Sequence, residues 1–299
     1  MSQTGQSIVP PPGLETRLVL QRPEPSRRDQ RPASRVSMRL RWMGRLAVRV
    51  LSVLICVAAW EVASRNNWHV LGMRFENVPA PSEIWEAGRD LAQSPKVGSH
   101  IVSSLKRIFA GFAIAAVLAT TLGLIIGRLR WAEDLLLSPL EVLRPIPAVA
   151  WIPLAILLWP TAESSMIFIT FIGAFFPILL STIHGVEQLD RRLVQASLTL
   201  GAGPLAIFRE VIFPGALPSI VTGLSIGMGT AWFSLITAEM VSGQFGIGYF
   251  TWEAYTLQDY PAIVLGMLII GSLGAISSAV IKLAGRRLTP WQALGGKAT

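Results

Sequence analysis

The sequence predicts an all-α membrane protein, a polytopic bundle of six transmembrane helices. Of its 299 residues, 52% are hydrophobic and only 15% are charged, a composition more apolar than that of an ordinary soluble domain. Long apolar segments recur along the chain, and the Lys and Arg residues gather mostly in the connections between them. These three observations together argue against a water-soluble fold.

Six segments are long enough to cross a bilayer, whose hydrocarbon core of about 30 Å needs roughly 20 helical residues. Each segment is apolar around most of its circumference, as helices exposed to lipid or buried in a bundle must be. The third and fourth are separated only by residues 159–163, which favours a tight turn at one surface. The predicted spans are 46–63, 105–127, 135–159, 164–183, 217–240 and 261–284.

The domain organisation follows from these spans. Residues 1–45 mix proline, arginine and polar residues without apolar periodicity, which predicts a disordered basic arm on the cytoplasmic side. Residues 46–290 form the predicted transmembrane domain, with a core over about 100–285 and a cytoplasmic loop at 184–214, and residues 291–299 form a short tail. Because the apolar run from Leu46 is long enough to span, it favours an uncleaved first helix over a signal peptide.

The positive charges predict the orientation, because Lys and Arg collect on the cytoplasmic side of a membrane. With both ends of the chain in the cytoplasm, the outer connections 160–163 and 241–260 contain no Lys or Arg. The 64–104 connection does contain four such residues, but long loops constrain orientation weakly. Many of the arginines behind the net charge of +8 precede the first span, so we expect no nucleic-acid partner.

The connection between the fourth and fifth spans predicts two short helices. The first runs to Leu200 and stops at Gly201, the residue type that best adopts a left-handed C-cap, and Pro204 opens the second. Pro214 and Pro218 mark the return to the membrane. Small residues let a partner's groove approach and apolar residues anchor it, so we predict a docking element built from Ala196, Ser197, Leu200, Ile207 and Phe208.

This connection resembles a known motif. The membrane subunits of bacterial ABC importers have Glu-Ala-Ala, a Gly four residues later, and then Ile-x-Leu-Pro. The matching residues here are Gln195-Ala196-Ser197, Gly201 and Val211-Ile212-Phe213-Pro214. Spacing, Gly and Pro agree, whereas Gln replaces Glu, Ser replaces Ala, Val replaces Ile and Phe replaces Leu.

Further motifs over roughly 80–290 resemble the nitrate, sulfonate and taurine branch of these permeases. They are Leu105-x-Arg107 with Gly111-Phe112, Leu143-Arg144-Pro145-Ile146-Pro147, Gly173-Ala174-Phe175-Phe176-Pro177-Ile178-Leu179, Ala238-Glu239-Met240, Gly246-Ile247-Gly248-Tyr249 and Arg286-Arg287-Leu288-Thr289-Pro290-Trp291. The resemblance implies a type I ABC importer permease (MetI-like) fold in the bacterial plasma (inner) membrane. It also implies a small anion such as nitrate, a sulfonate or taurine as substrate.

The resemblance implies partners as well. They are ABC ATPase subunits, a second permease copy in a homodimer, a periplasmic or lipid-anchored substrate-binding protein, and membrane lipid. It assigns the coupling to the ATPase to Gln195, Ala196, Ser197, Leu200, Gly201, Ile207, Phe208 and Pro214.

The chain offers no site for ATP or for catalysis. Gly296-Lys297 is followed by Ala298 and lacks the glycine spacing of a phosphate-binding loop, so we expect no cofactor here and ATP on the partner subunit. His69 and His100 are too isolated to predict a metal site, and no nucleophile triad is visible. We therefore predict a transport subunit, not an enzyme.

Polar residues inside the spans are candidates for the translocation path, because charges are costly in a membrane. Arg144 precedes Pro145 and Pro147, which break the helix and favour a polar lumen; the alternative is that Arg144 snorkels or pairs with Glu141 or Glu239. Glu239 fits either an external gate or an interfacial position. The hydroxyl residues either line the path or bond to their own helix. The predicted path residues are Arg144, Pro145, Pro147, Ser234, Thr237 and Glu239.

Two rival interpretations remain at this point. A self-contained secondary transporter predicts an inverted repeat and paired acidic residues in mid-span, and neither is visible. A non-transporting membrane assembly protein predicts that transport persists when the chain is deleted and its ATPase partner is kept.

Overall fold

The structure, a computed structural model, describes residues 35–70, 73–74 and 77–291. This part of the chain is helical except for a two-residue antiparallel hairpin formed by β1 (His69–Val70) and β2 (Met73–Arg74). The chain divides into two compact units, Met1–Val57 and Ala58–Thr299. The helix α1 (Arg35–Arg65) begins in the first unit and ends in the second.

The start of α1 corrects the predicted boundary of the basic arm. Residues 35–45, assigned to a disordered segment, are helical. Residues 35–43 contain no Gly or Pro and are rich in Arg, Met and Leu, residue types of high helix propensity. Residues 1–34 of the predicted arm and 292–299 of the predicted tail lie outside the described residues.

Within the described residues, five helical segments are long and apolar enough to cross a membrane. They agree in position with the predicted first, second, fourth, fifth and sixth spans. Their bounds are Leu46–Arg65, Pro95–Arg128, Ala162–Glu187, Pro204–Ser242 and Tyr260–Leu288.

The third span is present as two helices, and the predicted break at Pro145 and Pro147 is confirmed. The segments Arg130–Leu143 and Ala148–Leu158 meet at an angle of 85°. Proline lacks the backbone N–H that would continue the helical ladder, and Pro145 and Pro147 lie at the bend. The elements of this broken span are α4 (Arg130–Ala132), η3 (Glu133–Leu137), α5 (Ser138–Leu143), η4 (Ala148–Trp151) and α6 (Ile152–Leu158).

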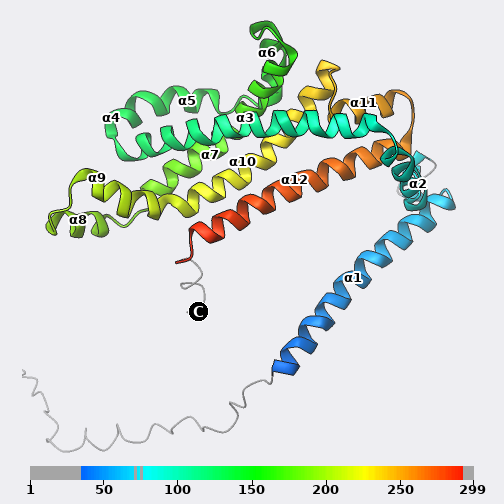
Figure 1. Cartoon of the computed structure of the whole chain (residues 1–299), viewed down its shortest axis with the longest axis horizontal. Coiled ribbons are helices and arrows are strands. Elements are labelled where there is room, and N and C mark those ends of the chain that lie inside the picture. Colours follow the sequence, from blue (N-terminus) through cyan, green and yellow to red (C-terminus); the bar gives the residue numbers. More distant parts are fainter. Residues whose placement is uncertain (1–34, 71–72, 75–76, 292–299) are drawn as a thin grey trace, which may run out of the picture. The chain divides into compact units, whose positions relative to one another are not determined.

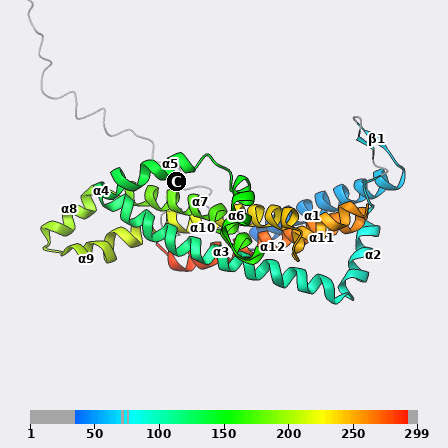
Figure 2. The ribbon, with the colours of Figure 1, turned by 90° about the horizontal axis from the view of Figure 1, so that it is seen from above.

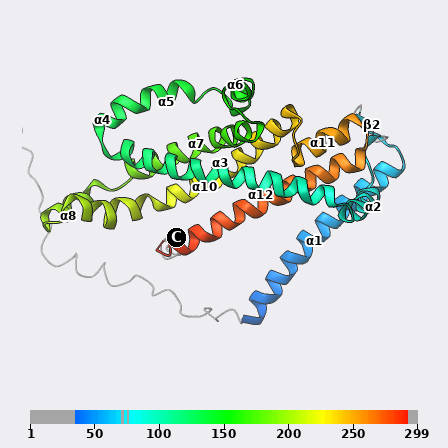
Figure 3. The same cartoon turned by 45° about the horizontal axis from the view of Figure 1, so that its top comes forward.

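The second unit is a bundle in which α3 (Pro95–Arg128) packs on α7 (Ala162–Glu187), α7 packs on α10 (Phe213–Ser242), and α10 packs on α12 (Tyr260–Leu288) (Figure 1). The short helices α8 (Arg191–Thr199) and α9 (Pro204–Ile207) lie at one end of these long helices. At the other end lie α2 (Pro81–Ala92) and α11 (Ile247–Thr256), and the views in Figures 2 and 3 agree. The bundle therefore has two distinct ends.

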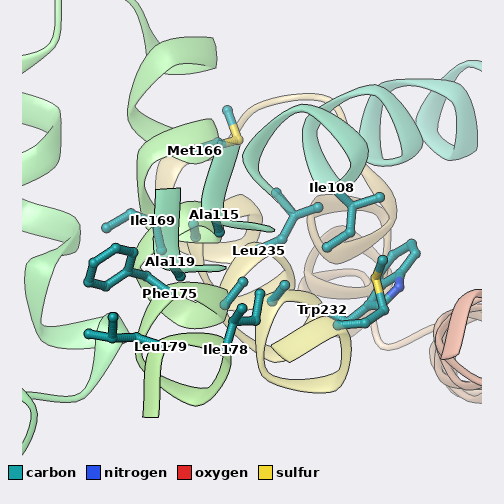
Figure 4. Close-up of a cluster of buried hydrophobic side chains, with 14 of the residues drawn as sticks. Ile108, Ala115, Ala119, Met166, Ile169, Phe175, Ile178, Leu179, Trp232 and Leu235 are labelled. Atoms are coloured by element: carbon teal, nitrogen blue, oxygen red, sulfur yellow. The ribbon is translucent and has the colours of Figure 1, made fainter. Parts of the chain in front are cut away.

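The core lies between α3, α7 and α10, and Figure 4 shows side chains from all three helices meeting there. Trp232 of α10 adds a polar link, because its indole N–H donates to the Ser277 hydroxyl of α12 at 2.9 Å. The central buried side chains are Ile108, Ala115 and Ala119 of α3, Met166, Ile169, Ile178 and Leu179 of α7, and Leu235 of α10.

Glycines bring these helices into close contact. A Cβ at Gly111 or Gly123 of α3 would lie 2.7 Å from Thr170 or Thr182 of α7. On α10, a Cβ at Gly223 would lie 2.6 Å from Ser181 of α7. Small residues allow such contacts between membrane helices, which explains why glycines recur inside segments that remain helical.

Candidate functional site

The connection between α7 and α10 forms an elbow, defined here as residues 191–207. Its first helix, α8, is capped by Asp190, whose carboxylate accepts the backbone N–H of Arg192 at 2.8 Å. The helix ends at Thr199, and Gly201 has a φ of +81°, in the left-handed region that favours glycine. The α9 helix begins at Pro204. The predicted stop at Gly201 and start at Pro204 are confirmed.

The second helix of the elbow is not separate from the membrane span, contrary to the prediction. It continues through η5 (Phe208–Ile212), a π-helical segment, into α10, so that Pro214 and Pro218 lie within a helix. Pro214 stands in the first turn of α10, where a missing backbone N–H is tolerated. In a membrane bundle, neighbouring helices and local π adjustments accommodate such prolines. A movement of α9 would therefore be transmitted directly to α10, because the two form one continuous helix.

The surface of the elbow is exposed and presents leucines beside polar residues. Leu200 is 88% exposed, and no residue of α8 is buried. Gln195 and Ala196 are exposed on the same helix, while Ser197 is half-buried and donates its hydroxyl to the Leu193 carbonyl at 2.8 Å. More than half of each side chain is exposed for Leu193, Leu198, Leu200 and Leu205.

Two predicted anchors of the elbow face the protein's own interior. Ile207 is only 2% exposed, so the prediction that it anchors a partner is wrong. The turn that starts at Pro204 directs it into a cluster formed with α3, α7 and α10, where burial removes its apolar surface from water. Phe208 is half-buried against the same cluster, and its ring centroid lies 6.5 Å from that of Phe213. The cluster contains Leu124, Val186, Ile207, Ile212, Ala216 and Ile220.

A groove of about 390 Å³ lies between α7, α10 and the bend of the broken span. It brings together three predicted path residues, Arg144, Pro147 and Ser234, with Gly173 and Thr230. Arg144 is exposed, and among the described residues it forms no ion pair with Glu141, Glu239 or another carboxylate. The groove thus places a guanidinium beside hydroxyl groups and an apolar wall.

The other predicted path residues lie differently. Pro145 is part of the bend but does not line the groove, and neither does Thr237. The hydroxyls of Ser234 and Thr237 donate to their own helix, to the carbonyls of Thr230 at 2.8 Å and Phe233 at 2.9 Å. Ser234 therefore borders the groove with its donor already engaged.

Glu239, another predicted path residue, does not line the groove. It is fully buried, and its carboxylate accepts the Arg107 guanidinium at 2.9 Å and the Ser104 hydroxyl at 2.7 Å. Arg107, only 2% exposed, also donates to Glu163 through two nitrogens and to the Phe245 carbonyl. A buried carboxylate requires such partners, which draw it into the protein.

The N-terminus of α11, with its N-cap Gly246, completes this arrangement with backbone N–H groups. Those of Gly248, Ile247 and Gly246 donate to Glu239, Ser104 and His100 respectively, each at 2.9 Å. A Cβ at Gly246 would lie 2.2 Å from the Glu239 carboxyl carbon, so only glycine fits there. We call this network the polar joint; its members are His100, Ser104, Arg107, Glu163, Glu239 and residues 246–248.

The sequence pattern does not predict the polar joint, because its members lie far apart along the chain. Arg107, Glu239 and the pair Gly246 and Gly248 each belong to a separate quoted motif. His100 was placed in a connection, whereas it is a buried residue of α3. Treating every charge in a predicted span as needing an opposite charge makes Arg107 one candidate partner for Glu239, beside Arg144.

Comparisons with known proteins agree with this architecture. The family model described as "Binding-protein-dependent transport system inner membrane component" matches residues 119–293. The permease protein SsuC of Escherichia coli, named for aliphatic sulfonates, is 36% identical over 84% of this chain and 94% of its own. The nitrate import permease protein NrtB of a Synechocystis species is 34% identical over 76% of this chain and 83% of its own.

More distant similarities point the same way. The taurine transport system permease protein TauC of Escherichia coli is 29% identical over 85% of this chain and 94% of its own. A crystal structure of an amino acid ABC transporter matches with a TM-score of 0.53 over 68% of this chain and 96% of that chain, at 16% identity, which supports the fold alone. The chain is a multi-pass membrane protein and belongs to the family of ABC importer permeases, in the branch that includes the nitrate, sulfonate and taurine permeases.

Proposed function

We propose that this permease carries a small oxyanion or organic anion along the groove at the bend of its third span. The relatives are named for nitrate, sulfonates and taurine, all of which present a compact, oxygen-rich anionic group. The observation that carries the proposal is Arg144, an exposed cation on the wall of a groove within the bundle. Such a charge costs about 2.5–3.5 kcal/mol in a membrane, a cost that an anion in the groove would offset.

Substitution of Arg144 tests this role. Arg144→Ala should reduce uptake of the anion by more than about tenfold, because a charge-assisted hydrogen bond contributes roughly 1.5–3 kcal/mol. Arg144→Lys should retain part of the flux, since it keeps the charge but loses the planar fork. Arg130→Ala removes an exposed arginine that does not line the groove and serves as the matched control. Unchanged anion uptake by Arg144→Ala at normal expression would refute the proposal.

We assign the coupling role to the elbow, which offers its exposed leucines to a separate ABC ATPase. Apolar side chains exposed together on a rigid turn are typical of a docking surface. Gln195, Ala196, Ser197, Leu200 and Gly201 lie on this surface, and the continuous helix from Pro204 into α10 would pass the motion to the bundle. ATP is bound by the ATPase subunit, and this chain contributes no cofactor.

Cysteine cross-linking tests the coupling role. Starting from Cys56→Ser, the variant Leu200→Cys should cross-link to an ATPase subunit in membranes that contain the whole importer. Phe245→Cys, exposed at the opposite end of the bundle, is the control and should not cross-link. Absence of cross-linking from Leu200, Ala196 and Leu205 alike would refute the assignment.

The remaining assignments complete the proposed importer. Two copies of the chain form a homodimer around the path, and a periplasmic or lipid-anchored binding protein delivers the anion. The chain lies in the bacterial inner membrane with both ends and the elbow in the cytoplasm, as the distribution of Lys and Arg supports. A reporter fused after Leu200 should therefore be active only as a cytoplasmic reporter.

A further inference from the structure

A second hollow lies between α10 and α12, toward the elbow end of the bundle. Its volume is about 420 Å³, and its walls are the first turns of α10 and the last turns of α12. The two helices approach closely at its floor, where a Cβ at Gly285 would lie 2.1 Å from Val221. The cleft is separate from the groove that contains Arg144, because the two share no lining residue.

Two cations face this cleft. Lys282 and Arg286 both line it, and their spacing of four residues places them one above the other on α12. Neither forms an ion pair with a carboxylate within the part of the chain that the structure describes. Like charges at this spacing repel each other, so an anion held between them would relieve the repulsion.

Most of the hydroxyl groups that line the cleft are already engaged. Those of Thr222, Ser225 and Thr289 donate to carbonyls of their own helix at 2.9 Å each, and Ser278 adds a neutral hydroxyl beside the cations. The ammonium and the guanidinium thus supply the charged donors, and both groups bind phosphate, the first as a point charge and the second as a planar fork.

The apolar surroundings point to a lipid as the source of the phosphate. The cleft has an apolar wall that includes Val221 and Ile226, and Ile226 is more than half exposed. A phosphate at the level of the cations would leave an acyl chain alongside these apolar side chains. Cationic residues at the cytoplasmic end of a span attract anionic lipids in this way.

The geometry points to a binding site for the phosphate headgroup of an anionic phospholipid in the cleft between α10 and α12. Lys282 and Arg286 hold the phosphate, and the wall at Val221 and Ile226 accommodates the start of an acyl chain. The site rests on the proposed function only in placing this end of the bundle at the cytoplasmic leaflet. It adds a specific lipid to the partners of the permease.

Native mass spectrometry of the purified full-length permease tests the site. The protein is extracted from vesicles of phosphatidylglycerol and phosphatidylcholine in equal amounts, and the retained lipid is identified. We expect phosphatidylglycerol to be retained preferentially. The variant Lys282→Gln/Arg286→Gln should lose about tenfold or more of this retention, since each cation at a membrane surface contributes roughly a fivefold effect.

Arg287→Gln is the matched control, because it removes an exposed cation of the same turn that does not line the cleft. Its retention of phosphatidylglycerol should stay within about twofold of the unmodified protein, whereas general surface attraction would weaken it as much as either cleft variant alone. Equal losses in Arg287→Gln, Lys282→Gln and Arg286→Gln would overturn the site.

A separate arm adds excess inorganic phosphate to the extracted protein. Retention of phosphatidylglycerol that persists supports a lipid, because the acyl contacts add to the phosphate contacts. Displacement of the lipid by phosphate, with inorganic phosphate bound in its place, would overturn the lipid assignment. None of these measurements involves uptake, so failure of this site is distinguishable from failure of the Arg144 path.

Discussion

The polar joint and the elbow lie at opposite ends of the same bundle. The first buries charged side chains, whereas the second exposes apolar ones. In the polar joint, Arg107 and Glu239 are almost completely removed from solvent and are satisfied by groups of this one chain. In the elbow, leucine side chains are exposed and have no apolar cover within the chain's described part. One end has its charges satisfied within the chain, whereas the other leaves leucines exposed for the subunit that we propose binds there.

The two regions also differ in how substitution should affect them. A buried ion pair contributes little net stability, but removing one partner leaves an uncompensated charge in a low-dielectric interior. An exposed leucine contributes little to the isolated chain and gains its energy only when a partner covers it. Variants that break the buried Arg107–Glu239 pair should therefore fail as proteins, and variants of the elbow should fold and fail in coupling.

The largest effect should follow removal of the central cation of the polar joint. Arg107→Met leaves Glu239 buried without its countercharge, and we expect the free energy of unfolding in detergent to fall by about 3–5 kcal/mol. Denaturant titration monitored by tryptophan fluorescence measures this fall.

A double variant separates charge from packing at this position. Arg107→Met/Glu239→Gln removes both charges and keeps an acceptor for Ser104 and Gly248, so it should recover more than half of the lost stability. If the double variant is as unstable as the single one, the ion pair is not the cause, and the contrast with the elbow disappears.

The second largest effect should come from the glycine that lies against Glu239. Gly246→Ala places a methyl group 2.2 Å from the carboxyl carbon, and overpacking of this kind costs about 1–3 kcal/mol. Gly98→Ala is the matched control at the same end of the bundle, because a Cβ there meets no atom within 4 Å. Thermal unfolding should show a lower midpoint for Gly246→Ala alone. Equal midpoints for the two variants would show that Glu239 can shift to accommodate the methyl group without loss of stability.

The spans and the turn of the elbow are features that the sequence predicts. Apolar length located five spans and the existence of a sixth, since spanning a bilayer requires a minimum number of residues. Local backbone rules located Gly201 and Pro204 at the elbow, because a left-handed turn and a helix start depend on adjacent residues.

The same local rules do not predict which side chains contact each other when they are far apart in the sequence. From the sequence alone, Glu239 is a path candidate because its span is known and its neighbours are not; Arg107 lies 132 residues away in the chain. Ile207 is a surface candidate for the same reason, since which face of a one-turn helix is buried depends on α3, α7 and α10. Contacts between distant segments, rather than local propensity, decide where both side chains lie.

A smaller effect on stability, but a clear one on coupling, should follow a change at the turn of the elbow. Gly201→Ala forces a side chain into a backbone with φ of +81°, which costs about 1 kcal/mol and disturbs the angle between α8 and α9. Uptake per ATP hydrolysed should fall while the yield of folded protein stays close to normal.

Gly203→Ala is the control for this change, because Gly203 has a φ of −73° and an added Cβ there would meet no atom within 4 Å. It should retain coupling, and Gly201→Asn should do so partly, since asparagine tolerates the left-handed region. A loss of coupling that is equal in Gly203→Ala and Gly201→Ala would mean that the glycine conformation does not set the elbow.

The smallest effect should come from the exposed end of the polar joint. Glu163 bonds to the same guanidinium as Glu239, but its side chain is 61% exposed, so water screens the ion pair. Glu163→Gln should therefore lower the free energy of unfolding by less than about 1 kcal/mol, with a salt dependence weaker than that of the unmodified protein. The two carboxylates differ chiefly in burial, and comparison of Glu163→Gln with Arg107→Met in the same denaturant titration isolates that difference. A loss for Glu163→Gln as large as that for Arg107→Met would mean that the exposed carboxylate, rather than the buried one, holds this end of the bundle together.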